Sequence, residues 1–371
     1  MNPVLVVAGA RPNFMKVAPI VAALEAGHIP RFLVHTGQHY DAAMSDTFFS
    51  ELGIPAPDRH LGVGSGSHAS QTARVMEAFE PVLEETRPSW VVVVGDVNST
   101  LACALVASKL RHATGCRIAH VEAGLRSNDW SMPEEVNRVL TDRLSDLLLT
   151  PSTDAEQNLL REGIEPERIV FAGNVMIDTL LRMLPAARAM NSPTMVRLAG
   201  KPYAVATLHR PSNVDDPDKL RVILTSLCGL TRSMPVVFPL HPRTRQRVTE
   251  FGLESLLEPL TATEPLGYTE MLGLQAGAAV VVTDSGGVQE ETTVLGIPCV
   301  TLRETTERPV TVTEGTNRLA PWPLTEQGIL TATNAALAQG SVPLGSRAPH
   351  GWDGRASERI VAALESLGSV A

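Results

Sequence analysis

Short apolar segments alternate along this chain with longer segments of helical periodicity, and this alternation restricts the fold more than any other feature. The apolar runs are bounded by Gly, Pro, Asp or Thr, which is typical of buried strands. Repeated strand-helix units fold as a parallel sheet with helices on both faces. The predicted strands are Val4–Ala8, Phe32–Thr36, Trp90–Val94, Ile118–Val121, Leu147–Thr150, Ile169–Phe171, Tyr203–Thr207, Val236–Leu240, Leu256–Pro259, Val280–Thr283 and Cys299–Leu302.

The strands form two sets, which predicts two domains. A length of 371 residues also exceeds that of one ordinary domain. The segment "LLRMLPAARAMNSPTMVRLAGKP" between the sets lacks a strand run and contains three prolines, which is typical of a helix followed by a linker. We therefore expect an α/β fold with two doubly wound, Rossmann-like domains, 1–190 and 191–371, that face a central cleft. The last helix is a candidate to pack back on the first domain.

Charge and cysteine usage restrict the partners and the compartment. Thirty-one basic and 40 acidic residues give a net charge of −9, the wrong sign for a protein that coats nucleic acid or an anionic membrane. The four cysteines are scattered without CxxC spacing, which indicates reduced, packed thiols. The N-terminal apolar stretch is too short for a signal sequence, and no run approaches the length of a membrane span. These features predict a cytoplasmic protein without nucleic-acid or membrane partners.

Polar segments follow most of the predicted strands. Ligands of doubly wound sheets bind beyond the carboxyl ends of the strands, so these segments are the candidates for chemistry. A single polar loop would be ordinary, but here the loops after eight of the predicted strands are polar. The segments are "GARPNFMK", "GQHYD", "GDVNST", "EAGLRS", "HRPSN", "HPRTR", "DSGGVQEE" and "RETTERP".

The segment "VVTDSGGVQEE" predicts a phosphate-binding turn. Ser285, Gly286 and Gly287 lie between a strand and a helix, where unpaired backbone amides and the positive end of the helix favour an anion. Glu291, one turn into that helix, can reach back to a ribose diol, which favours a nucleoside diphosphate. The alternative interpretation is a tight turn that needs glycine for steric reasons alone. The candidates to neutralise the diphosphate are Arg11, Lys16 and Arg308.

Other nucleotide and metal signatures are absent from the sequence. No G-x-x-x-x-G-K-[ST] loop occurs, and the glycines from Gly62 to Gly66 are followed by Ser67 where a dinucleotide motif needs glycine. No His, Cys or Asp cluster has metal-ligand spacing. The sequence therefore predicts no metal and no bound cofactor.

Several long strings, in order over nearly the whole chain, are similar to those of the non-hydrolysing UDP-N-acetylglucosamine 2-epimerases. They are "GARPNFMKVAPI", "HTGQHYD", "GDVNST", "HVEAGLRS", "MPEEVNRVLTD", "GNVMID", "TLHRPSN" and "DSGGVQEETTVLGIP" followed by "RETTERP". The resemblance implies a glycosyltransferase-B type fold and a cytoplasmic homodimer. It also implies interconversion of UDP-N-acetylglucosamine and UDP-N-acetylmannosamine without NAD.

The resemblance also implies roles for individual residues. Asp96, Glu122 and Glu134 match the carboxylates that handle protons, and His209 matches the histidine near the departing diphosphate. From the residues alone, each has a structural alternative, such as helix capping for Glu122 and Glu134 or a turn for Asp96. Two further residues are candidate ligand-site groups: Arg138, a possible partner of Glu134 at i+4, and His241. Gln38 and His39 resemble part of an allosteric UDP-N-acetylglucosamine site.

The chemistry explains why such residues are needed. Carbon 2 of the sugar has no adjacent carbonyl, so ordinary side chains cannot remove its proton directly. Departure of UDP develops positive charge beside carbon 2, and a base can then remove the proton to leave a 1,2-unsaturated glycal. A glycosyltransferase or a hydrolysing epimerase could share the fold and the nucleotide site. A non-catalytic nucleotide-sugar sensor is a further alternative, but it would not need the carboxylates.

Overall fold

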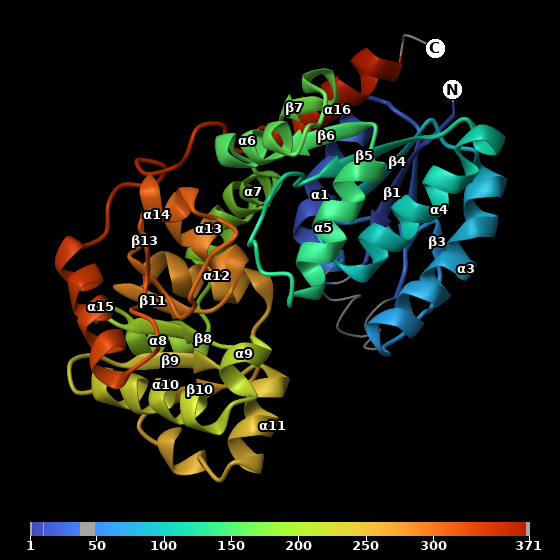
Figure 1. The fold of residues 1–371 in the computed structure, drawn as a ribbon. Helices are drawn as coiled ribbons and strands as arrows, with labels where there is room; N and C mark the ends of the chain where they lie inside the picture. The colour runs from blue at the N-terminus through green and yellow to red at the C-terminus, as the bar shows by residue number, and fades with distance from the viewer. Residues whose placement is uncertain (1, 10, 38–48, 369–371) are drawn as a thin grey trace. The chain divides into compact units, whose positions relative to one another are not determined.

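The computed structural model describes residues 2–9, 11–37 and 49–368 of the chain, which divides into two compact units. Unit 1 comprises Met1–Arg182 and His350–Ala371, and unit 2 comprises Met183–Pro349. The chain passes from unit 1 to unit 2 within helix α7 (Val175–Ala189), a few residues before the boundary expected at 190. The colours of Figure 1 follow the chain through unit 1, then unit 2, and back to unit 1 in the red helix α16 (Ala356–Gly368).

Unit 1 is built on a seven-stranded sheet in the order β3-β2-β1-β4-β5-β6-β7, with every neighbouring pair parallel. Its strands are β1 (Val4–Ala8), β2 (Arg31–His35), β3 (Arg59–His60), β4 (Trp90–Val94), β5 (Arg117–Val121), β6 (Leu147–Thr150) and β7 (Ile169–Phe171). Its other helices are α1 (Arg11–Ala26), α3 (His68–Thr86), α4 (Asn98–Thr114), α5 (Pro133–Leu144), α6 (Thr153–Arg161) and the short 3-10 helix Pro166–Arg168.

The central strands of unit 1 are buried on both faces, as their unbroken apolar sequences require. Leu5 and Val93 pack with Phe79 of α3 and Ala102 of α4 in one fully buried cluster. Helix α16 packs against α1. Asp178 of α7 caps α16 by accepting hydrogen bonds from the first backbone amides of that helix, at 3.1 and 2.7 Å. Helix α16 is thereby fixed to the rest of unit 1.

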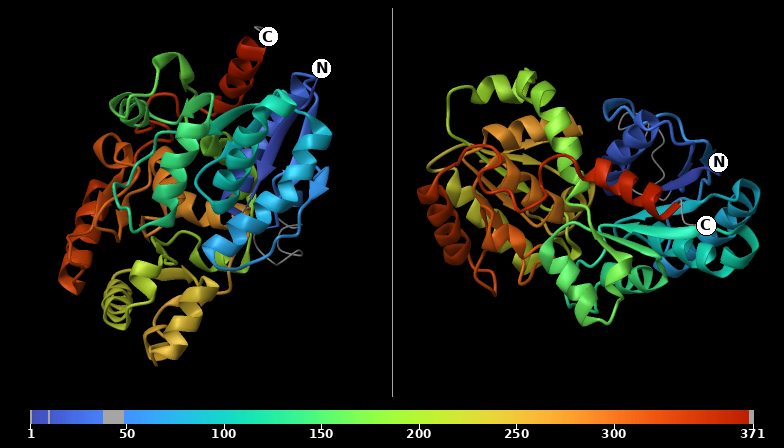
Figure 2. Two further views of the ribbon diagram at one scale, coloured as in Figure 1. Left: turned by 45° about the vertical axis from the view of Figure 1, so that its right-hand side comes forward. Right: turned by 90° about the horizontal axis from the view of Figure 1, so that it is seen from above.

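Unit 2 is built on a six-stranded parallel sheet in the order β10-β9-β8-β11-β12-β13. Figure 2 shows the ribbon from two further sides. Its strands are β8 (Ala204–Thr207), β9 (Val236–Pro239), β10 (Thr261–Thr263), β11 (Val280–Thr283), β12 (Cys299–Thr301) and β13 (Asn317–Leu319). Its helices are α8 (Pro193–Leu198), α9 (Pro211–Val214), α10 (Pro217–Leu230), α11 (Pro242–Glu250), the 3-10 helix Glu254–Leu256, α12 (Tyr268–Gly277), α13 (Gly286–Leu295), α14 (Val310–Thr313) and α15 (Glu326–Gln339). Apolar residues of the central strands pack against α10 and α15 in its main core.

The predicted fold class is confirmed, because each unit is a doubly wound, parallel α/β domain. The strand predicted at Leu256–Pro259 is wrong: that segment comprises the last residue of a 3-10 helix and the turn after it, and the strand is Thr261–Thr263. The edge strands β3 and β13 were not predicted, because neither Arg59–His60 nor Asn317–Leu319 has an apolar run. Across the described residues, no helix is both long enough and apolar enough to span a membrane.

Candidate functional site

In unit 1, the turns after the neighbouring strands β4 and β5 carry Asp96 and Glu122. Glu122 has a φ of 73°, and such a left-handed conformation costs a non-glycine residue roughly 1–3 kcal/mol. Gly95, with a φ of 68°, lies at the end of β4. A Cβ atom on Gly95 would lie 3.3 Å from Oε2 of Glu122, so the two turns are in close proximity.

Helix α1 places Lys16 against Glu122. The two side chains form a buried ion pair, in which each charge offsets the cost of burying the other. Asn13, one turn earlier, donates a hydrogen bond of 2.8 Å to the Val94 carbonyl at the end of β4. The first helix is therefore fixed to the turn after β4. The sequence suggested Lys16 for the diphosphate, whereas here its ammonium contacts a candidate catalytic carboxylate.

Asp96 is held by helix α5. Arg138 donates to Oδ2 of Asp96 from Nε at 3.0 Å and lies within 2.9 Å of the same oxygen through Nη2. Asn137 donates to the Asp96 backbone carbonyl at 2.8 Å. The predicted pairing of Arg138 with Glu134 is wrong, since the second carboxylate that Arg138 contacts is that of Glu135.

Glu134 and Glu135 have different surroundings in the first turn of α5. Glu135 is buried and accepts hydrogen bonds from the backbone amides of Ser127 and Asn128, at 2.8 to 3.1 Å. Glu134 is half-buried, and within the described part of the chain its carboxylate has no hydrogen bond or ion pair. Glu135 therefore stabilises the loop before α5, whereas Glu134 is available to a ligand.

In unit 2, Ser285 is the N-cap residue of α13, and Gly286 and Gly287 are its first two residues. The backbone amides in this first turn have no partner within the helix, so the turn has the geometry of an anion site. A Cβ atom on Gly286 would lie 2.6 Å from Nη1 of Arg308 and 2.9 Å from Oε1 of Glu307. Glycine at 286 therefore allows the Arg308 guanidinium to lie directly beside the helix start.

Arg308 belongs to a cluster of three arginines and two glutamates, all of them buried except Arg210. Arg308 contacts Glu290 at 2.7 Å and Glu307 at 2.5 Å, and Glu307 also contacts Arg303 at 2.7 Å and Arg210 at 3.4 Å. Burial lowers the pKa of Arg303, as do the nearby charges of Arg210 and Arg308. These five side chains carry one more positive than negative charge, so a phosphate beside them would find net attraction.

His209, after β8, is oriented by Asp284, a residue that the sequence reasoning missed. His209 Nδ1 lies 3.0 Å from Oδ1 of Asp284, and the backbone amides of His209 and Arg210 donate to the same carboxylate at 2.9 to 3.1 Å. Burial alone would raise the pKa of Asp284, but His209 and these amides hold it below the usual range. Because Nδ1 faces Asp284, Nε2 of the 38% exposed ring remains for a ligand.

His241 lies next to His209, with ring centroids 5.7 Å apart. It is the N-cap residue of α11, and its Nδ1 accepts a hydrogen bond of 3.2 Å from the backbone amide of Arg243. His241 therefore caps α11, and a role as a ligand-site group stays a prediction.

Glu291, the predicted ribose ligand on α13, is buried. Its Oε2 accepts a hydrogen bond of 3.0 Å from Gln275. Burial raises the pKa of Glu291 to about 7, although hydrogen bonds from Gln275 and Tyr268 act in the opposite direction. In its ionised form, the Glu291 carboxylate can accept hydrogen bonds from the hydroxyl groups of a ribose.

Three predicted residues lie wholly or partly outside the described structure. Gln38 and His39 are outside the described residues, and for Arg11 only the backbone, at the start of α1, is described. Over residues 2–9, 11–37 and 49–368, no group of three or more His, Cys, Asp or Glu side chains has a metal-binding arrangement.

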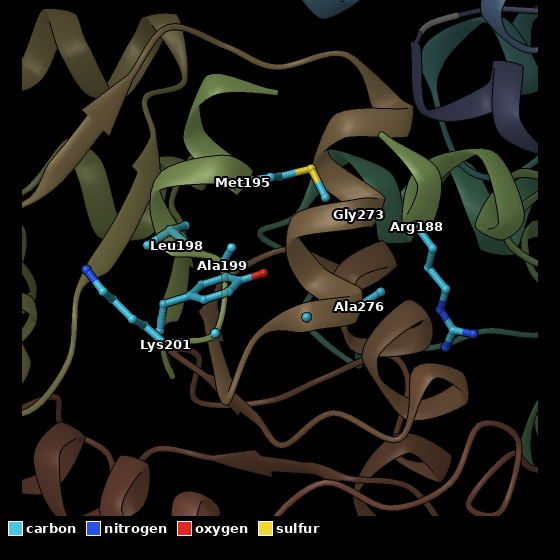
Figure 3. A pocket seen from close by; sticks show the side chains of 10 residues that line it. Arg188, Met195, Leu198, Ala199, Lys201, Gly273 and Ala276 are labelled. Carbon is cyan, nitrogen blue, oxygen red and sulfur yellow. The ribbon is translucent and has the colours of Figure 1, made fainter. Parts of the chain in front are cut away.

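A cavity of about 410 Å³ lies in unit 2, at the amino ends of β8 and β11. Figure 3 shows Met195 directed toward Gly273 of α12, with Arg188 and Lys201 on opposite sides. Its lining residues are Arg188, Met195, Leu198, Ala199, Gly200, Lys201, Tyr203, Gly273, Ala276 and Gly277. It contains none of the predicted site residues, which follow the carboxyl ends of the strands.

The chain is similar to known proteins over most of its length. The family model for UDP-N-acetylglucosamine 2-epimerase matches residues 22–365. A UDP-N-acetylglucosamine 2-epimerase of Methanocaldococcus jannaschii is 43% identical over 325 residues, 85% of this chain and 87% of the relative. A UDP-2,3-diacetamido-2,3-dideoxy-D-glucuronate 2-epimerase of Pseudomonas aeruginosa is 44% identical over 320 residues, again 85% of this chain and 87% of the relative.

A solved structure extends this similarity to three dimensions. The crystal structure of the Methanocaldococcus jannaschii UDP-GlcNAc 2-epimerase, in complex with UDP-GlcNAc and UDP, has a TM-score of 0.87 and 40% sequence identity. The alignment covers 98% of this chain and 99% of the other. Sequence and structure therefore agree over nearly the full length, and the chain belongs to the UDP-N-acetylglucosamine 2-epimerase family.

Proposed function

We propose that this protein inverts carbon 2 of UDP-N-acetylglucosamine to give UDP-N-acetylmannosamine, reversibly and by elimination of UDP. The observation that carries the proposal is that Asp96 and Glu122 lie on the turns after two neighbouring strands of unit 1, and that these turns are close to each other. Each carboxylate is held by a cation, Arg138 for Asp96 and Lys16 for Glu122. Two acid or base groups at the carboxyl ends of neighbouring strands suit a reaction that removes a proton from one face and returns one to the other.

The proposed reaction has two reversible steps. First, the bond from carbon 1 to the diphosphate oxygen breaks, and its electron pair leaves with UDP. A carboxylate of unit 1 removes the proton from carbon 2, and the electrons of that bond form the double bond between carbons 1 and 2. A second acid then protonates carbon 2 from the opposite face, while the UDP oxygen attacks carbon 1. Glu122, Asp96 and Glu134 are the proposed acids and bases.

Unit 2 is proposed to bind and stabilise the departing UDP. The first turn of α13 and the Arg308 cluster suit the diphosphate, whose negative charge increases as the carbon–oxygen bond breaks. His209, oriented by Asp284, is a suitable proton donor to the leaving oxygen through Nε2. Glu291 is proposed to accept the ribose hydroxyls. Arg11 and His241 complete the proposed ligand contacts, and Gln38 and His39 remain a proposed allosteric site.

A second candidate substrate for the same reaction is UDP-2,3-diacetamido-2,3-dideoxy-D-glucuronate, because the Pseudomonas aeruginosa relative with that activity is 44% identical to this chain. The chemistry at carbons 1 and 2 is the same for both sugars. They differ in the substituents at carbons 3 and 5.

The resemblance to the family adds three further parts to the proposal. They are a homodimer, a cytoplasmic location and a reaction without NAD.

The products of an incubation distinguish the candidate functions. Purified protein is incubated with each UDP-sugar in turn, without added nicotinamide, and the products are separated and identified by NMR. We expect a mixture of UDP-N-acetylglucosamine and UDP-N-acetylmannosamine, reached from either epimer. Free N-acetylmannosamine with UDP would indicate a hydrolysing enzyme, and UDP release only with an acceptor would indicate a transferase. Binding of UDP without any product would indicate a sensor.

A further inference from the structure

A buried histidine and aspartate lie beneath the two candidate catalytic carboxylates. His120 is on β5, two residues before Glu122, and Asp142 is on α5; both are fully buried. Nδ1 of His120 lies 2.6 Å from Oδ1 of Asp142, and Nε2 lies 2.8 Å from the backbone carbonyl oxygen of Gly95. The imidazole ring thus bridges helix α5 and the turn after β4.

The direction of these hydrogen bonds follows from the acceptors. The Gly95 carbonyl can only accept, so Nε2 of His120 donates to it. Burial would raise the pKa of Asp142, but His120 and Arg126 outweigh burial and hold it below the usual range. Oδ1 of this carboxylate faces Nδ1 of the same ring, so one imidazole links Asp142 to the Gly95 carbonyl.

The Gly95 carbonyl is part of the peptide that leads into Asp96. The Gly95 amide donates to the Val121 carbonyl at 3.0 Å, and its carbonyl accepts from His120, so both ends of this residue are fixed to β5 or its side chains. Gly95 also lies against the Lys16–Glu122 pair, because a Cβ atom there would be 3.3 Å from both charged groups. Loss of the His120 contact would let this turn, which carries Asp96, move relative to Glu122.

Asp142 holds the other turn, the one that carries Glu122. Its Oδ2 accepts a hydrogen bond of 3.1 Å from the Gly124 amide and contacts Arg126 at 2.7 Å. Gly124, with a φ of 83°, packs so tightly that a Cβ atom would lie 2.3 Å from the Ala155 carbonyl oxygen. One carboxylate thus fixes the backbone two residues after Glu122 and, through His120, the backbone one residue before Asp96.

We propose that the His120–Asp142 pair positions the two turns that bear Asp96 and Glu122, so that both carboxylates keep the relative placement that the reaction needs. The inference rests on the proposed function, in which these two carboxylates handle the proton at carbon 2. Neither His120 nor Asp142 touches the substrate in this proposal. Their loss should therefore lower kcat and leave the binding of UDP, which involves unit 2, nearly unchanged.

The test compares kcat, KM and UDP affinity of the full-length wild type, His120→Ala, His120→Gln and Asp142→Asn. A displacement of about 1 Å can lower a rate by about 10²-fold, so His120→Ala should reduce kcat by roughly that factor, with KM and the UDP Kd within about twofold. His120→Gln can still donate to the Gly95 carbonyl and should recover part of the loss. Asp142→Asn retains the shape of the side chain, and it too should reduce kcat alone.

Leu148→Ala is the matched control. Leu148 is fully buried on β6 and lies directly opposite His120 in the strand register. Its replacement by alanine destabilises the protein by leaving a cavity, without removing a polar contact. Its folded fraction should retain wild-type kcat. The inference is overturned if the His120 and Asp142 variants, measured as folded protein, match Leu148→Ala in kcat, or if KM rises as much as kcat falls. A wild type that forms no epimer would instead overturn the proposed function, and this inference with it.

Discussion

Replacement of Glu122 by glutamine is expected to lower kcat by about 10²- to 10⁴-fold, the range for loss of a general acid or base. The glutamine side chain has the same shape and can still accept a hydrogen bond from Lys16, but it cannot remove or return a proton. Glu122 is buried, and its left-handed backbone holds the carboxylate at the end of β5. Steady-state epimerisation, with UDP affinity measured by calorimetry, checks this expectation.

The UDP affinity of Glu122→Gln should stay within a few-fold of wild type, because Arg308 and the first turn of α13, proposed to bind the diphosphate, are in unit 2. Glu85→Gln is a suitable control, since Glu85 is 65% exposed in a surface ion pair with Arg59. That variant should retain full activity. Wild-type turnover by Glu122→Gln would show that another group handles the proton at carbon 2.

Arg308→Ala should both destabilise unit 2 and weaken UDP binding. Its guanidinium is buried against Glu290 and Glu307, and removal of one member of a buried ion pair typically costs about 3–5 kcal/mol. Loss of one charge-assisted contact to the diphosphate should reduce UDP affinity by roughly 10- to 100-fold, given about 1.5–3 kcal/mol for such a bond. Urea unfolding gives the first quantity, and calorimetry on folded protein gives the second.

Arg232→Ala is the control for this variant. Arg232 is an exposed arginine in unit 2, on the turn that precedes β9 and so at the opposite end of the sheet from α13. Its removal should change the free energy of unfolding by less than about 0.5 kcal/mol and leave UDP affinity unchanged. If Arg308→Ala lost stability but bound UDP as tightly as this control, Arg308 would be a structural residue only.

The sequence was sufficient to predict the central strands of both sheets, but it was not sufficient to predict the edge strands. Trp90–Val94 and Val280–Thr283 are buried on both faces, so their sequences are continuous apolar runs that can be recognised without a structure. Arg59–His60 is an exposed two-residue edge strand, and such a strand needs no apolar run. Leu256–Pro259 shows the opposite error, because its leucines pack on the core from a turn.

The position of the candidate site could also be predicted, because chemistry in doubly wound sheets lies after the carboxyl ends of the strands. The partners of the site residues could not. Helical spacing favoured Glu134 as the partner of Arg138, but Arg138 contacts Glu135 and, far along the chain, Asp96. Asp284 and Asp142 act through contacts between distant segments, and no local pattern distinguishes them from other strand-end or helical aspartates.

The central claim is that carbon 2 loses its proton to the protein and regains one that has exchanged with solvent. Incubation of the wild type with UDP-N-acetylglucosamine in heavy water, followed by proton NMR of the separated sugar nucleotides, tests it most directly. We predict deuterium at carbon 2 of the UDP-N-acetylmannosamine formed and, after reversal, of the recovered UDP-N-acetylglucosamine. Epimer that forms with the original hydrogen retained at carbon 2 would contradict elimination through a glycal.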